Sequence, residues 1–76
     1  MITMKRFHTL DEVHKIQNLA TMCPSAVALR SMDGATTVDA KSFIGCYTLN
    51  FREPVVVESD NVSFHNLIRN IGQNVG

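Results

Sequence analysis

Residues 25–39, Ser-Ala-Val-Ala-Leu-Arg-Ser-Met-Asp-Gly-Ala-Thr-Thr-Val-Asp, predict a β-hairpin and largely determine the fold class. In the first half of this stretch apolar side chains alternate, and Val27 and Leu29 fall on one face of a strand. Asp33-Gly34 is typical of a hairpin turn, because this pair supplies the positive φ angles that such turns need. A run of β-branched residues after the turn favours a return strand.

Upstream of the hairpin, the sequence predicts a strand over residues 2–7 and then a helix that begins after Thr9. Thr9 and Glu12 have the spacing of a capping box, in which the Thr9 hydroxyl accepts from the N–H of Glu12 and the Glu12 carboxylate accepts from the N–H of Thr9. Pro24 ends the helix. Its apolar stripe is expected to comprise Leu10, Val13, Ile16, Ala20 and Cys23, with Leu19 alongside.

Downstream of the hairpin, a short helix is expected over residues 40–49, followed by a connector. Val55-Val56-Val57 predicts a strand that is apolar on both faces and therefore central in the sheet. A final amphipathic helix is expected to follow, with its apolar stripe formed by Phe64, Leu67, Ile68, Ile71 and Val75.

The predicted order of elements is βαββαβα over a single domain of residues 1–76. Strands and helices in this order favour an α+β fold, with a four-stranded antiparallel sheet and three helices on one face.

Composition narrows the class of function. The formal net charge is zero and the pI is near 6.8, which argues against nucleic acid or a membrane surface as a main partner. The sequence has neither an apolar run of about 18 residues nor a signal-peptide layout, so we expect a soluble cytoplasmic protein without membrane insertion. Cys23 and Cys46 do not form a disulfide framework, and the scattered histidines predict no metal site and no cofactor.

The segment Ala-Lys-Ser-Phe-Ile-Gly-Cys-Tyr-Thr-Leu, residues 40–49, carries the most specific motif in the chain. It resembles the segment around the regulatory serine of the HPr family, the small phosphocarrier proteins of the bacterial sugar phosphotransferase system. The resemblance is best over residues 25–49 and continues more weakly through the last strand and helix. It implies the open-faced β-sandwich of that family, in agreement with the element order.

The family's phosphoacceptor histidine lies in a Gly-Leu-His-Ala-Arg-Pro-Ala motif at the turn into the first helix. Residues 7–13 of this chain are Phe-His-Thr-Leu-Asp-Glu-Val. Aligning this segment with the family motif without gaps places Thr9 at the position of the histidine, Asp11 at that of the arginine and Glu12 at that of the proline. The two carboxylates would each repel a phosphoryl group by ~1 kcal/mol at exposed distances. We therefore expect histidine phosphotransfer to be impaired or lost.

Two interpretations of His8 stay open. If the registration slips by one residue, His8 is the phosphoacceptor of an active phosphocarrier; otherwise it is a solvated histidine in a turn. His14 and His65 are expected to be ordinary surface or half-buried residues.

Ser42 is the candidate for regulatory phosphorylation. The resemblance implies that a serine kinase modifies this residue and that the phosphoprotein takes part in carbon catabolite regulation. A phosphate at a helix start would meet the positive end of the helix dipole and unpaired N–H groups. The alternative is that Ser42 is only the N-cap of the helix.

Partner docking is assigned to Lys41, Ile44 and Tyr47. By resemblance the partners are proteins: enzyme I, sugar-transporter components, the serine kinase or a transcriptional regulator. The sequence contains no nucleophile–base pair, carboxylate dyad or Gly-rich phosphate loop, so we do not expect an enzyme. The remaining alternative is an interaction module that has kept only the fold.

Overall fold

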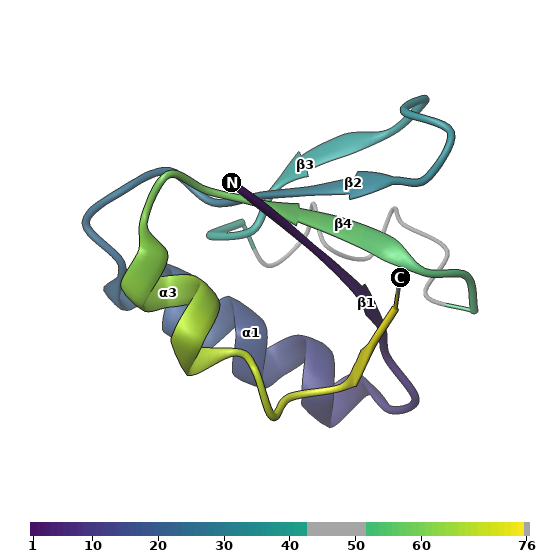
Figure 1. The fold of residues 1–76 in the computed structure, drawn as a ribbon, viewed down its shortest axis with the longest axis horizontal. Helices are drawn as coiled ribbons and strands as arrows, with labels where there is room; N and C mark the ends of the chain where they lie inside the picture. Colours follow the sequence, from purple (N-terminus) through teal and green to yellow (C-terminus); the bar gives the residue numbers. More distant parts are fainter. Residues whose placement is uncertain (43–51, 76) are drawn as a thin grey trace.

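In the part of the chain that the structure describes, an antiparallel sheet carries two helices on one of its faces (Figure 1). The structure is a computed structural model and describes residues 1–42 and 52–75. The described elements in chain order are β1 (Ile2–Arg6), α1 (Leu10–Met22), β2 (Ala28–Ser31), β3 (Thr37–Asp39), β4 (Val55–Glu58), α3 (Val62–Leu67) and β5 (Gln73–Asn74). The strand order across the sheet is β3-β2-β4-β1-β5. The predicted α+β class with an antiparallel sheet is therefore confirmed.

The predicted hairpin is present as β2 and β3, with Leu29 paired to Val38. Within the turn only Gly34 has a positive φ, of 76°, so the expectation that Asp33 shares this conformation is wrong. Asp33 acts through its side chain instead. Its Oδ1 accepts hydrogen bonds from the Ser31 hydroxyl at 2.6 Å and from the Ala35 N–H at 2.9 Å.

β4 lies between β2 and β1, as its apolar sequence predicts. All three of its valines are buried, with exposures of 1%, 8% and 0% in chain order. The face toward the helices packs against one hydrophobic core. Its members are Phe7, Val13, Ile16, Ala20, Cys23, Val27, Leu29, Ala40, Val55, Val57, Phe64 and Ile68.

The C-terminal segment differs from the prediction. α3 begins after Asn61, whose Oδ1 accepts from the Phe64 N–H at 3.0 Å, and it ends at Leu67 instead of continuing to Val75. Gly72 follows with a φ of 71°, which a helix does not allow. Residues 73–74 then pair with β1, and the sheet formed by the described residues has five strands instead of the predicted four.

α1 follows its predicted bounds closely, but one residue of its stripe is misplaced. The Val13, Ile16, Ala20 and Cys23 side chains are buried, whereas Leu10 in the first turn is 55% exposed. Of the helix expected over residues 40–49, Ala40 and Lys41 form a turn and residues 43–49 lie outside the described part of the chain. No helix in the described ranges has the length and apolarity needed to cross a membrane.

Candidate functional site

The turn into α1 is organised by the carboxylate of Glu12. Its Oε1 accepts from the backbone N–H of Thr9 at 3.2 Å, and the Thr9 hydroxyl accepts from the N–H of Glu12 at 3.3 Å. The predicted capping box is therefore present. The same Oε1 also accepts from the backbone N–H of His8 at 2.6 Å, the shorter of its two contacts.

These contacts place a negative charge at the N-terminus of α1. The His8 N–H is the main cause that lowers the pKa of Glu12, with further contributions from Thr9, from the charge of His8 and from the Gly72 backbone. A carboxylate bonded to backbone N–H groups at a helix start is the same arrangement by which proteins bind external anions. In this turn the anion is the chain's own side chain.

His8 is exposed, and its ring lies toward the C-terminal strand. Its Nε2 lies 3.2 Å from Oε1 of Gln73, a carboxamide oxygen that can only accept. The neutral ring therefore has its proton on Nε2. The imidazole is held against β5 by this contact, although an exposed side chain can exchange it for water.

The side chain of Lys5, near the end of β1, extends toward the helices. The side chain is fully buried, and Nζ donates to the carbonyls of Ile68 at 2.6 Å and Arg69 at 3.1 Å. Burial lowers the pKa of Lys5, and the charge of Glu12 partly opposes that effect. The ammonium thus binds the two carbonyls that directly follow α3. Arg6, the next residue, is exposed.

Ser42 is exposed near the end of the first described range. Its N–H donates to the Asp39 carbonyl at 2.9 Å, and the preceding N–H, that of Lys41, donates to Asp39 Oδ1 at 2.9 Å. These two bonds fix the backbone just before and at the serine. Phosphorylation at Ser42 stays a prediction.

Lys41 has a structural contact that its sequence position does not suggest. It is half-buried, and Nζ donates to the Cys23 carbonyl at 3.0 Å. Cys23 is the C-cap of α1, and the last turn of that helix contains no basic residue of its own. Lys41 supplies the missing positive charge from a segment 18 residues away. Ile44 and Tyr47, the other predicted docking residues, lie outside the described ranges.

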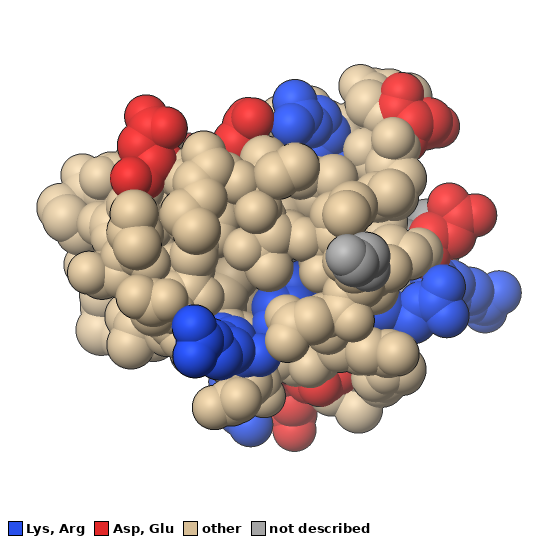
Figure 2. All heavy atoms as spheres, viewed as in Figure 1, with Lys and Arg blue, Asp and Glu red and all other residues tan. Residues whose placement is uncertain are grey.

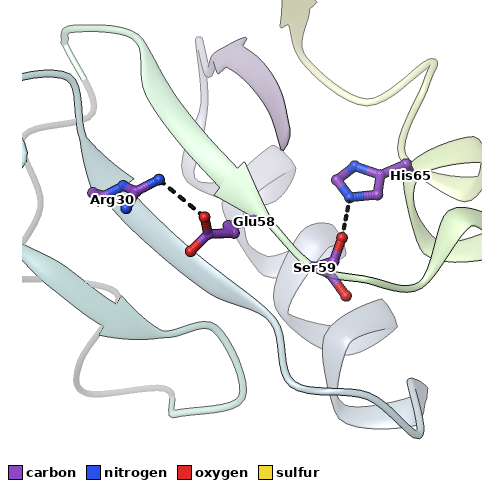
Figure 3. Close-up of polar contacts among 4 residues, drawn as sticks. All are labelled: Arg30, Glu58, Ser59 and His65. Atoms are coloured by element: carbon purple, nitrogen blue, oxygen red, sulfur yellow. Dashed lines mark hydrogen bonds and ion pairs between the residues drawn. The ribbon is translucent and has the colours of Figure 1, made fainter. Parts of the chain in front are cut away.

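His65 is buried, contrary to the expectation of a surface or half-buried residue. Figure 3 shows that Glu58, the last residue of β4, points to Arg30 of β2, whereas Ser59, which follows the strand, lies beside His65 of α3. Because the Ser59 carbonyl accepts, at 2.9 Å, His65 Nε2 must donate. Nδ1 of the neutral ring then accepts from the Thr3 hydroxyl at 2.7 Å.

An apolar groove of about 280 Å³ runs between the end of α1 and the start of α3. Met22 and Leu67 on its two sides are 73% and 61% exposed. Its lining is formed by Leu19, Met22, Cys23, Pro24, Asn61, Ser63, Phe64 and Leu67.

The described residues contain no group of three or more His, Cys, Asp or Glu side chains that could bind a metal ion. Comparison with known proteins identifies no relative, since no protein-family model, no curated protein and no solved structure matches this chain.

Proposed function

We propose that this chain is a non-enzymatic regulatory and docking protein, similar in role to the HPr family, in which phosphotransfer through a histidine has been lost. The proposal joins the sequence resemblance over residues 40–49 to one observation in the turn before α1. That observation is the carboxylate of Glu12, which occupies the backbone N–H groups of His8 and Thr9.

Phosphotransfer through His8 would place a dianionic phosphoryl group beside this carboxylate. The N–H donors that would otherwise stabilise the phosphoryl group are already bonded to Glu12. Repulsion between two like charges costs ~1 kcal/mol at exposed distances and more where water is excluded. The turn is therefore suited to stability of the helix start and poorly suited to holding a transferred phosphoryl group.

The regulatory part of the proposal concerns Ser42. The residue is exposed, as a kinase substrate must be. In the proposal a serine kinase modifies Ser42 in the cytoplasm, and Ile44 and Tyr47 contact a partner such as a transcriptional regulator or a component of the phosphotransferase system. Lys41 contributes by fixing the backbone before Ser42 to the end of α1.

Two phosphorylation assays test this function. The protein is incubated with enzyme I and labelled phosphoenolpyruvate, and separately with the serine kinase and labelled ATP. We expect no acid-labile label in the first assay. In the second we expect a label that is lost in Ser42→Ala and retained in Ser63→Ala, a matched change at an exposed serine of α3.

Each remaining outcome selects a different function. An acid-labile label that disappears in His8→Ala would overturn the proposal and identify an active phosphocarrier. The absence of label in both assays would also overturn it, and would leave an interaction module that shares only the fold.

A further inference from the structure

A polar hollow of about 240 Å³ lies beside β1 and the C-terminal end of α3. It is lined by Met1, Thr3, His65, Asn66, Arg69 and Asn74, none of which is acidic. Figure 2 shows Lys and Arg atoms close to the carboxyl end of α3 on this face of the molecule. The hollow thus combines hydrogen-bonding groups with positive charge.

Arg69 is the residue of this lining whose side chain can donate hydrogen bonds to a ligand. Its carbonyl accepts from Lys5 Nζ and from Asn74 Nδ2, but within residues 1–42 and 52–75 its guanidinium makes no hydrogen bond or ion pair. The guanidinium is exposed and offers five N–H donors in a planar fork. The side-chain amide of Asn66, also exposed, adds further donors at the same hollow.

Hydrogen bonds hold several other groups of the wall in place. His65 is 6% exposed and is fixed through both ring nitrogens, to Thr3 and to the Ser59 carbonyl. Asn74 is fixed to the Arg69 carbonyl at 3.1 Å. A preformed wall lowers the entropy that a ligand must lose on binding.

The charge around the hollow also favours an anion. The carbonyls at the C-terminal end of a helix bear partial negative charge, which would repel an anion. Here Lys5 Nζ donates to the carbonyl of the C-cap residue Ile68 at 2.6 Å and to the next carbonyl, that of Arg69, at 3.1 Å, so a buried positive charge opposes that effect. Glu12 offsets part of the Lys5 charge but does not line the hollow.

From these observations we infer that the hollow binds a small oxyanion, a carboxylate or phosphate group, through the guanidinium of Arg69 with the amide of Asn66 beside it. The planar fork of arginine matches the two oxygens of either group. This site is distinct from Ser42 and His8, and its existence does not depend on the proposed function.

NMR of the histidine rings tests the inference on the intact chain. Inorganic phosphate and acetate are titrated separately against chloride at constant pH and ionic strength. His65 lines the hollow, whereas His8 and His14 do not, so their rings serve as internal controls for pH and salt. We expect saturable shifts at His65 with at least one of the two anions, and no saturable change at the other two rings.

Variants at two arginines complete the test. Arg69→Gln should weaken anion binding about tenfold or more, as loss of a charge-assisted hydrogen bond predicts. Arg69→Lys, which keeps the charge without the fork, should fall between that variant and the parent. Arg6→Gln removes an exposed arginine outside the hollow and should leave binding unchanged. Equal binding in Arg69→Gln, no saturation at His65, or similar shifts at all three histidines would overturn the inference.

Discussion

The sheet face that packs against the helices is apolar on β2 and β4 but polar on β1. On β2 and β4 it is formed by Leu29, Val55 and Val57, which are almost fully buried. On β1 the corresponding positions are Thr3, paired with Val57, and Lys5, paired with Val55. Both of these polar side chains bond to the α3 region, Thr3 through His65 and Lys5 through carbonyls.

The comparison shows that two kinds of interaction stabilise the contact between the sheet and the helices. The apolar side is stabilised by removal of carbon surface from water and by dense packing. On the polar side each buried group must find a partner, because an unpaired donor or acceptor would cost about 1–3 kcal/mol. No buried side-chain nitrogen or oxygen in the described residues lacks a partner. The two sides should therefore respond differently to mutation and to pH.

The largest effect is expected on the apolar side. Leu29 is 1% exposed and packs in the core, so Leu29→Ala should lower the free energy of unfolding by about 3 kcal/mol through lost burial and a residual cavity. Urea denaturation followed by circular dichroism measures this change. The loss should be the same at neutral and alkaline pH, and a clear dependence on pH would contradict the apolar description.

A second effect is expected where the C-terminal segment returns to β1. Gly72→Ala should destabilise by about 2 kcal/mol or more, because the residue has a φ of 71° and a Cβ there would meet a Phe7 ring carbon at 3.0 Å and the Arg6 carbonyl at 3.1 Å. Gly34→Ala is the matched control, with a φ of 76° but no atom within 4 Å of the added Cβ. It should cost only about 1 kcal/mol from backbone strain. Equal losses in thermal denaturation would show that the close approach at Gly72 has no energetic consequence.

The polar side is probed by Lys5→Met, which keeps most of the length of the side chain but removes its donors. We expect a loss of about 1–3 kcal/mol at neutral pH, since the Ile68 carbonyl would lose the partner that Lys5 provides. The free energy of unfolding of the parent protein should also depend on pH. Burial lowers the pKa of Lys5 below 10.5 in the folded state, so between that lowered value and 10.5 the unfolded state binds more protons.

Stability of the parent should accordingly rise with pH in that alkaline window, relative to Lys5→Met. Urea denaturation of both proteins at a series of pH values up to 10.5 measures the difference. A constant difference between the two proteins would mean that burial of the Lys5 ammonium does not affect its ionisation.

Local chemistry explains which parts of the fold are predictable from sequence. The hairpin, the capping box and the central position of β4 depend on residues close together in the chain, and all three are present. The apolar spacing through Ile68, Ile71 and Val75 equally favours a continued helix. Gly72 overrides it, because its positive φ lets the chain turn back to β1.

The functional residues divide along the same line. The Thr9–Glu12 box is visible in sequence, whereas the contact of Glu12 with the His8 N–H depends on the shape of the turn. The burial of His65 and the attachment of Lys41 to the end of α1 involve contacts with distant segments. A useful signal for His65 is the alternation of β1, which places Thr3 and Lys5 together on one face.

The smallest effect is expected at the turn before α1, outside both halves of the sheet face. Hydrogen bonds from the backbone, led by that of His8, lower the pKa of Glu12 below its usual 4.5. A carboxyl group with a lowered folded-state pKa stabilises the fold above its unfolded pKa, and that contribution disappears as pH falls through the lowered value. Glu12→Gln should thus lose less stability than the parent between pH 4.5 and more acidic conditions.

The pKa of Asp33 is also lowered, because the Ser31 hydroxyl and the Ala35 N–H donate hydrogen bonds to its carboxylate. Asp33→Asn is therefore the matched control, and the double variant should have the flattest acid profile in thermal denaturation. If Glu12→Gln keeps the parent's acid slope while Asp33→Asn removes it, the Glu12 carboxylate is not bound to the turn in solution. The N–H groups of His8 and Thr9 would then be available to an external anion, and the main argument against phosphotransfer at His8 would fail.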